Sequence, residues 1–146
     1  MSDQDTAGLN KNQPTETPQK YLSGRFSLGQ KERLKSAKSI EHLFSEGKAI
    51  SAYPLRLVFV SNPNSTVPMQ CAFSVSKRHF KKAVDRNRIK RLLRESYRKI
   101  KPTLNQNLSQ PYMGMILFNG KEIPSQENTN KSVSILIEKW LKSLSL

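Results

Sequence analysis

The residues best suited to chemistry in this sequence are the arginines and lysines between positions 77 and 101. This stretch holds 12 basic side chains against the two acidic residues Asp85 and Glu95, so it carries ten of the 14 net positive charges of the 146-residue chain. Arginine suits phosphate because its planar guanidinium group can donate two parallel hydrogen bonds. Such a concentration of positive charge indicates a polyanionic partner, such as nucleic acid or an anionic membrane, and its position on an arginine-rich helix favours a phosphate-bearing partner of the kind that nucleic-acid proteins bind.

Most of this basic stretch has the pattern of one long helix, from about Ala83 to Ile100, which we expect Pro102 to end. At about 100° per residue, apolar side chains gather on one side and basic ones on the other. The core side holds Ile89, Leu92, Leu93, Ser96, Tyr97 and Ile100, and the opposite side holds Asn87, Arg91, Arg94 and Arg98. A charged face is often merely solvated, but such a face usually mixes signs because like charges on neighbouring turns repel. The excess of one sign therefore favours a binding surface.

A short helix is predicted upstream, at about residues 36–46. Its apolar side chains fall on one helical face, and they are Ala37, Ile40, Leu43 and Phe44. Ser36 is placed to cap the start of this helix, and Gly47 is placed to end it. Phe44 lies at the end of the apolar stripe, so it belongs either to the core or to an exposed binding surface.

Strand-like runs lie on both sides of the long helix. The residue pattern predicts strands at 55–60, 70–76 and 112–119, with a possible edge strand at 48–53. The stretch 132–146 has the apolar spacing of a closing amphipathic helix. The order helix, two or three strands, helix, strand, helix predicts an α+β sandwich whose helices cover mainly one face of a sheet.

The first two strands are expected to have one apolar face each. In the first strand, alternation opposes Leu55, Leu57 and Phe59 to Arg56, Val58 and Val60. In the second strand, it opposes Cys71, Phe73 and Val75 to Gln70, Ala72, Ser74 and Ser76. We therefore expect a sheet with one core face and one mixed, partly polar face.

The remaining composition bears on domain count and compartment. Residues 1–24 are polar throughout and predict a disordered tail, which leaves 25–146 as a single domain. Cys71 is the only cysteine, so an intrachain disulfide and a Cys-rich zinc module are excluded. The N-terminal residues have the pattern of neither a secretory signal nor a membrane span. We expect a cytoplasmic protein with no membrane partner.

The strand, turn and helix at residues 73–95 have the sequence FSVSKRHFKKAVDRNRIKRLLRE. This stretch resembles the protein subunit of bacterial ribonuclease P, whose signature is an Arg-Asn-Arg helix that follows a strand and a basic turn. Arg86, Asn87 and Arg88 stand in that signature, and the dozen positions around them match as well. The likeness continues more faintly through residues 26–48 and covers about residues 25–143.

The resemblance implies an α+β fold with a mixed sheet in the order α-β-β-β-α-β-α, the fold of ribonuclease P proteins and of a ribosomal protein domain. It also implies a holoenzyme in which an RNA subunit removes the 5' leader of precursor tRNA by Mg2+-dependent endonucleolytic cleavage. The partners are then ribonuclease P RNA and precursor tRNA. Mg2+ is held mainly by the RNA subunit and the substrate, and the protein is a non-catalytic subunit with no catalytic or metal-binding residue of its own.

Carried over position by position, the resemblance assigns two surfaces. The contacts to the RNA subunit are Lys77, Arg78, Lys82, Arg86, Asn87, Arg88, Lys90, Arg91, Arg94 and Arg98. A cleft between the first helix and the sheet holds the single-stranded leader, and its lining residues are Ile40, Phe44, Arg56, Val58 and Ser74.

Two places depart from the family pattern. The basic turn, Lys77–Lys82, is one residue longer than the commonest family form and lacks its glycine, which leaves the path into the helix open. Ile40 stands where the family often carries an aromatic residue, and an aliphatic side chain gives none of the base stacking that is worth about 1–3 kcal/mol per base. Leader affinity is therefore expected to depend more on Phe44 and on charge.

Two other classes of function fit parts of the sequence. A ribosomal or other structural RNA-binding protein would share the basic helix but needs no cleft for a single strand. A protein-only nuclease needs clustered carboxylates to bind metal ions, whereas Asp85 and Glu95 are isolated among arginines. His42 and His79 have no partner at metal-ligand spacing, so they are more simply surface residues or phosphate contacts, and we expect His79, inside the basic turn, to help bind RNA.

Overall fold

The computed structural model describes residues 29–145, and the tail predicted at 1–24 lies outside them. The elements in chain order are a 3-10 helix η1 (Gln30–Glu32), α2 (Ala37–Glu46), β1 (Lys48–Ala52), β2 (Leu55–Ser61), β3 (Met69–Val75), α3 (Ala83–Asn107), β4 (Tyr112–Phe118) and α4 (Gln126–Leu144). The predicted order of helices and strands is confirmed, and β1 is the edge strand expected at 48–53.

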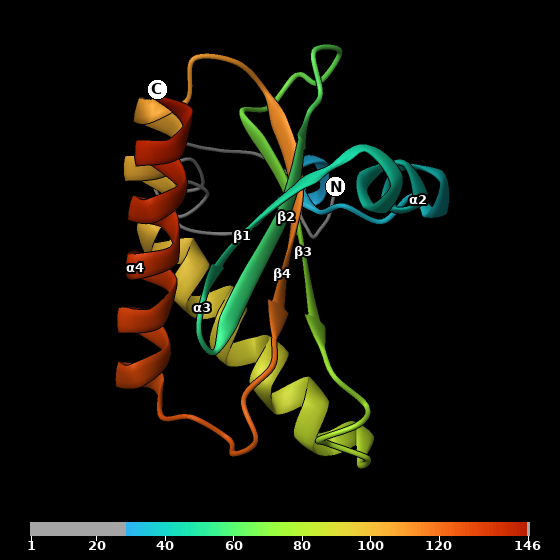
Figure 1. The fold of residues 1–146 in the computed structure, drawn as a ribbon, viewed down its shortest axis with the longest axis vertical. Coiled ribbons are helices and arrows are strands. Elements are labelled where there is room, and N and C mark those ends of the chain that lie inside the picture. The colour runs from blue at the N-terminus through green and yellow to red at the C-terminus, as the bar shows by residue number, and fades with distance from the viewer. Residues whose placement is uncertain (1–28, 146) are drawn as a thin grey trace, which may run out of the picture.

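Within residues 29–145, the strands form one mixed sheet in the order β1-β2-β4-β3 (Figure 1). β2 pairs antiparallel with β1 and β4, whereas β3 pairs parallel with β4 and is joined to it through α3. α3 and α4 pack together and cover one face of the sheet, and the shorter α2 lies against the other face (Figure 1). The predicted α+β fold, with its helices mainly on one face, is confirmed.

The main core lies between the sheet and the two long helices. The alternation predicted for β2 and β3 is confirmed. Their residues buried in this core are Leu55, Leu57, Phe59, Met69, Cys71 and Val75. Trp140 of α4 is fully buried beside Phe59 and Tyr112, with ring centroids 5.3 and 5.4 Å away. Aromatic pairs in such tilted or edge-on arrangements add about 0.5–1.5 kcal/mol each to the stabilisation from burial.

A second, smaller apolar cluster attaches α2 to the opposite face of the sheet. Leu43 of α2 is buried there with Val58 of β2 and with Met113 and Met115 of β4. The sequence predicted a mixed and partly polar surface on this face. The methionines of β4 make the part under α2 more apolar than expected.

Both ends of α2 have the predicted caps. The hydroxyl of Ser36 accepts a hydrogen bond from the N–H of Ser39, and the N–H of Gly47 donates to the carbonyl of Leu43. A Cβ atom at residue 47 would lie 2.2 Å from that carbonyl oxygen, far inside contact distance. Glycine is therefore required where the chain turns from α2 into β1.

The prediction that Pro102 ends the long helix is wrong, because α3 continues to Asn107. Proline lacks the N–H that would bond to the carbonyl four residues earlier, and inside a helix this costs about 3 kcal/mol. The extension buries Leu104 completely in the main core, which contributes about 1.5–3 kcal/mol, and it also packs Leu108 there. Tertiary packing thus outweighs the local preference of proline.

α4 begins at Gln126, earlier than the predicted stretch 132–146. Its first turn is polar and meets polar groups of α3, because Nε2 of Gln126 donates to the carbonyl of Leu92 at 3.2 Å and to Oγ of Ser96 at 3.0 Å. Ser125 caps the helix by accepting from the N–H of Asn128 at 3.1 Å. The first turn of α4 packs against α3 through hydrogen bonds of polar side chains, so apolar periodicity could not locate where this helix begins.

The N-terminal segment, residues 29–35, lies along the edge strand β3. The N–H of Leu34 donates to the carbonyl of Cys71 at 3.1 Å. Nζ of Lys101 in α3 donates to the carboxylate of Glu32 at 2.9 Å, and the Lys101 side chain is only 5% exposed. Lys101 is therefore part of a buried ion pair and not of the basic surface that the sequence indicated.

Candidate nucleic-acid interface

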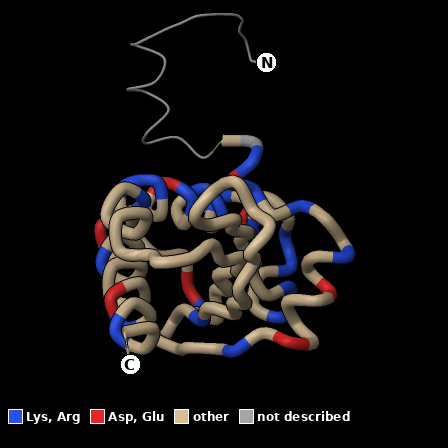
Figure 2. Tube along the Cα trace, turned by 90° about the horizontal axis from the view of Figure 1, so that it is seen from above, with Lys and Arg blue, Asp and Glu red and all other residues tan. Residues whose placement is uncertain are grey.

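The basic face predicted on α3 is present and open to solvent. Its exposed members are Asn87, Arg88, Arg91 and Arg94, and Lys90 is half-buried. The opposite side is buried as predicted, and its buried residues include Ile89, Leu93, Ser96 and Tyr97. Seen from above, most charged positions along the chain trace are basic (Figure 2). α3 thus presents cations to a partner while its apolar side stays in the core.

The basic turn, Lys77–Lys82, follows a defined path from β3 into α3. Phe80 is buried in it, with its ring centroid 6.0 Å from that of Phe118. Nη1 of Arg86 donates to the carbonyls of Phe80 and Lys81, both at 2.8 Å. Arg86 therefore holds the turn against the start of α3, and the longer turn needs no glycine.

The predicted RNA contacts in and around the turn differ in what they can offer a phosphate. The exposed cations of the turn include Lys77, Arg78 and Lys82. Arg86 is engaged by the turn carbonyls, and Arg98 forms an ion pair with Glu95. A hydrogen bond from the Arg98 guanidinium holds the pKa of the Glu95 carboxyl below its usual range. These two arginines are thus less available to a phosphate than the exposed arginines of α3.

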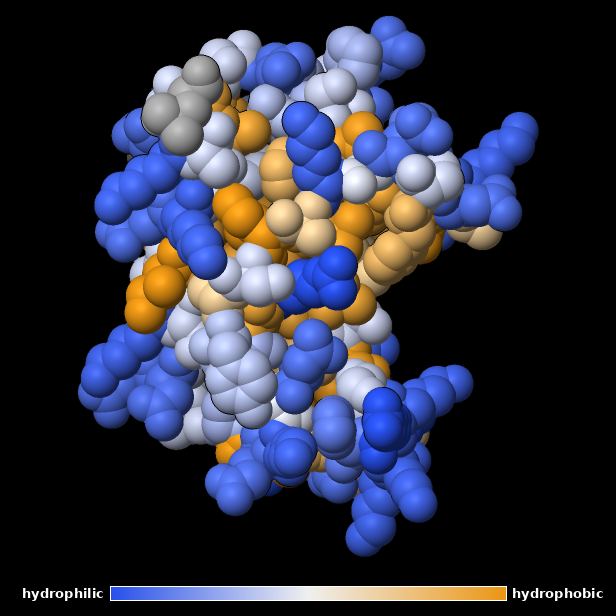
Figure 3. Space-filling model, viewed as in Figure 1, coloured by the Kyte–Doolittle hydropathy of each residue, from blue (hydrophilic) through white to orange (hydrophobic). Residues whose placement is uncertain are grey.

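The open face of the sheet forms a cleft beside α2. The strand register places Ser51, Arg56, Leu117 and Ser74 in one row across the sheet, on the face away from α3 and α4. Figure 3 shows the surface hollowed on its right side, between α2 above and the basic turn below, with apolar groups inside the hollow. Arg56 and Ser74 therefore share one surface, as the sequence predicted.

The predicted cleft residues around α2 have unequal access to this surface. Phe44 is 52% exposed, so it is not a core residue, although its neighbour Leu43 is fully buried. Ile40 is half-buried and packs against the second cluster. Val58 cannot line the cleft as predicted, because α2 covers it and only 6% of the residue is exposed. Phe44 is therefore an exposed aromatic side chain on α2, the helix that borders the cleft.

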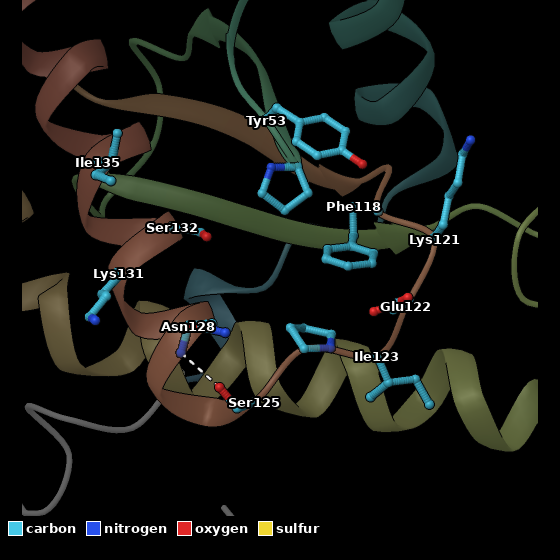
Figure 4. Close-up of a pocket in the computed structure, with 13 residues that line it drawn as sticks. Tyr53, Phe118, Lys121, Glu122, Ile123, Ser125, Asn128, Lys131, Ser132 and Ile135 are labelled. Atoms are coloured by element: carbon cyan, nitrogen blue, oxygen red, sulfur yellow. Dashed lines mark hydrogen bonds between the residues drawn. The ribbon is translucent and has the colours of Figure 1, made fainter.

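Another hollow, of about 620 Å³, lies between the β1–β2 turn and the start of α4 (Figure 4). Lys121 and Lys131 extend from opposite sides of it, and Glu122 lies next to Lys121 in the chain. The hydroxyl of Ser125 is engaged in capping α4. The charged residues of its lining are two lysines and one glutamate, a net charge of only +1, and we assign this hollow no role in binding a polyanion.

Two kinds of feature are absent from residues 29–145. No three His, Cys, Asp or Glu side chains in that range gather where they could hold a metal ion, and His42 and His79 are exposed. Asp85 lies in the first turn of α3, where the helix dipole favours a carboxylate. None of the helices in the same range has the length and apolar character needed to cross a membrane.

An exposed basic helix face and basic turn, together with an open cleft bordered by a helix that carries an exposed aromatic side chain, are the features of a protein that binds nucleic-acid strands. Comparison with known proteins identifies the family, because the family model described as Ribonuclease P matches residues 28–143. The chain belongs to the ribonuclease P family.

Related sequences agree with this assignment. The chain is 42% identical over 86 residues to the ribonuclease P protein component of Porphyromonas gingivalis, a match that covers 58% of this chain and 63% of that protein. It thus spans less than two thirds of the length of that relative. The ribonuclease P protein component of Caldanaerobacter subterraneus subsp. tengcongensis is 34% identical over 114 residues, which cover 78% of this chain and 90% of the relative.

Solved structures with the same fold include RNase P proteins. The Staphylococcus aureus protein superposes with a TM-score of 0.61 at 17% identity, over 74% of this chain and 94% of that chain. The Thermotoga maritima protein superposes with a TM-score of 0.60 at 20% identity, over 74% of this chain and 96% of that chain. At these identities, the likeness supports the fold.

Proposed function

We propose that this chain is the protein subunit of a ribonuclease P holoenzyme and supports removal of the 5' leader from precursor tRNA. Family membership supports this function. The observation that carries it is that one molecule presents two surfaces. One is the exposed basic face of α3 with its basic turn, and the other is the cleft bordered by α2, the helix that carries the exposed Phe44. One molecule can thereby hold the phosphates of an RNA subunit and an unpaired strand at the same time.

The basic surface is assigned to the RNA subunit. Its central residues are Arg88, Arg91 and Arg94 on α3, joined by Asn87 and Lys90 and by Lys77, Arg78 and Lys82 of the turn. Each cation that neutralises a phosphate releases a condensed counterion, so the affinity should fall steeply with salt. Because Arg86 and Arg98 have protein partners, we expect them to contribute less to this salt dependence.

The cleft is assigned to the 5' leader. The ring of Phe44 can stack on an unpaired base, and Arg56 on the sheet can hold a phosphate of the same strand. Ser74 lies in the same row of the sheet and adds a hydroxyl group that can hydrogen-bond to the strand. Ile40 packs against the cluster below α2 and thereby positions the helix that carries Phe44.

The chemistry is assigned to the RNA subunit, with Mg2+ held mainly by that RNA and by the substrate. The acidic residues of the basic stretch fit this division, because Asp85 lies at the start of α3 and Glu95 pairs with Arg98. The protein's part is electrostatic: its cations reduce repulsion between the two RNA molecules, so the holoenzyme should need less Mg2+ than the RNA alone. We place this activity in the cytoplasm.

A reconstitution experiment tests the proposal. Cleavage of precursor tRNA by a bacterial ribonuclease P RNA at low Mg2+ is expected to be strong with this protein and weak without it, and the protein alone should cleave nothing. If the protein binds RNA but leaves cleavage unchanged, a structural RNA-binding role replaces the proposal. If the protein alone cleaves, and Asp85→Asn abolishes that activity, a protein-only nuclease replaces it.

A further inference from the structure

A further concave surface lies at the edge strand β3, outside the cleft assigned to the leader. This edge groove has a volume of about 370 Å³, and its floor is residues 71–73 of β3. The basic residues that line it are Arg33 and Lys35 of the N-terminal segment and Lys90 and Arg94 of α3. Among residues 29–145, the lining includes no aspartate or glutamate. Four cations from two separate parts of the chain therefore converge on one hollow.

The N-terminal segment that supplies one side of the edge groove is fixed in place. Its backbone joins β3 through the hydrogen bond from Leu34 to the carbonyl of Cys71, 3.1 Å long. The buried ion pair between Glu32 and Lys101, 2.9 Å long, ties the same segment to α3. The two basic residues of this segment thus project from a backbone that is already ordered, which lowers the entropy lost on binding.

The other side of the edge groove is also preorganised. The guanidinium carbon of Arg94 lies 5.8 Å from the centroid of the Phe73 ring, a cation–π arrangement. The Phe73 ring in turn meets Tyr97 edge to face at 5.7 Å. Phe73 is therefore a positioning residue that orients a cation, and its ring face is covered by Arg94 and is not free to stack on a base.

These features select the ligand. A groove whose described lining has four cations and whose aromatic ring is covered by Arg94 suits the phosphates of a nucleic-acid backbone better than bases. Resting on the proposed function, we infer that the edge groove binds the sugar-phosphate backbone of the RNA subunit. The RNA subunit is favoured over the leader because Lys90 and Arg94 belong to the α3 surface assigned to that RNA. The interface thereby extends around β3 to the start of α2, with Arg33 and Lys35 as contacts.

Binding of the isolated RNA subunit by the full-length protein tests this inference. In the variant Arg33→Gln/Lys35→Gln, affinity should fall at least about tenfold, and the slope of log K against log salt should drop by about 1.4–1.8 for two lost phosphate contacts. Lys131→Gln/Lys142→Gln removes two exposed lysines of α4 and is the matched control, which should bind like the wild type. Lys35→Gln alone removes one exposed cation and should give about half the change in slope.

The outcomes separate this inference from the proposed function. Arg88→Gln/Arg91→Gln serves as the reference for the basic face of α3. If this reference variant loses affinity while the edge-groove variants bind like the wild type, the groove assignment is overturned and the proposed function stands. If neither set loses affinity, both are overturned. If the edge-groove variants bind the RNA subunit normally but bind leader-bearing precursor tRNA more weakly in the holoenzyme, the groove belongs to the substrate. Should Arg33→Gln/Lys35→Gln fail to fold, the salt-dependence slope of Lys35→Gln tests the groove assignment instead: an unchanged slope overturns it.

Discussion

Replacing Phe44 by alanine should weaken binding of the 5' leader while leaving the protein folded. Phe44 is 52% exposed, so its truncation should cost at most about 2 kcal/mol of stability, against about 3–5 kcal/mol for a fully buried phenylalanine. Stacking of an unpaired base on an aromatic ring is worth about 1–3 kcal/mol. The affinity of the holoenzyme for precursor tRNA should therefore fall by roughly 5- to 150-fold.

The assay compares two substrates and two variants. Dissociation constants are measured for reconstituted holoenzyme with leader-bearing precursor tRNA and with mature tRNA, and only the first should weaken. Leu43→Ala is the matched control, because this neighbouring residue of α2 is fully buried and its truncation should cost about 2–5 kcal/mol of stability. Equal losses for both tRNAs in Phe44→Ala, with a melting temperature as low as that of Leu43→Ala, would refute the leader-cleft reasoning.

Two further predictions concern how the surfaces are held in place, and a third concerns the buried cysteine. Arg86→Ala should lower stability by about 2 kcal/mol, because it removes two charge-assisted hydrogen bonds. The control Arg91→Ala should leave stability unchanged. Equal midpoints of urea unfolding for the two variants would contradict this prediction. Glu32→Gln should lower stability by about 1.5–3 kcal/mol, because the ammonium of Lys101 loses a charged partner that lies 2.9 Å away. Adding Lys101→Met should recover part of the loss in the same unfolding measurement. Burial raises the pKa of the Cys71 thiol, so a thiol reagent at neutral pH should label it only after denaturant is added, and fast labelling of the native protein would speak against this.

Sequence patterns predicted the fold well where each element has one buried side. Period-two alternation identified the core face of β2 and β3, and helical spacing identified the buried side of α3. The errors fall where tertiary contacts override local rules. Burial of Leu104 carries α3 past Pro102, and the hydrogen bonds of Gln126 to α3 let α4 begin in a polar stretch. Neither contact can be deduced from spacing within one segment.

For the candidate site as well, the sequence predicts the type of each side chain, but not its surroundings in the folded protein. The sequence predicted which side chains carry positive charge, but the exposure of each depends on partners distant in the chain. Glu32 removes Lys101 from the basic surface, although 69 positions separate the two residues. Arg33 and Lys35 were not singled out, because only the pairing of the N-terminal segment with β3 brings them beside the basic face of α3. Likewise, the docking of α2 buries Val58 and leaves Phe44 exposed.

The lengths of the helices explain why this fold has an open cleft and a projecting basic surface. α2 has ten residues, so at about 1.5 Å per residue it is about 15 Å long, whereas the seven-residue strands β2, β3 and β4 each span about 23 Å. One short helix cannot cover that face, and the row containing Arg56 and Ser74 stays open beside it. α3 has 25 residues and is about 37 Å long, which exceeds the length of the strands. Because only one side of α3 packs in the core, its opposite side can carry the basic face along the same turns, and the basic turn joins its N-terminal end.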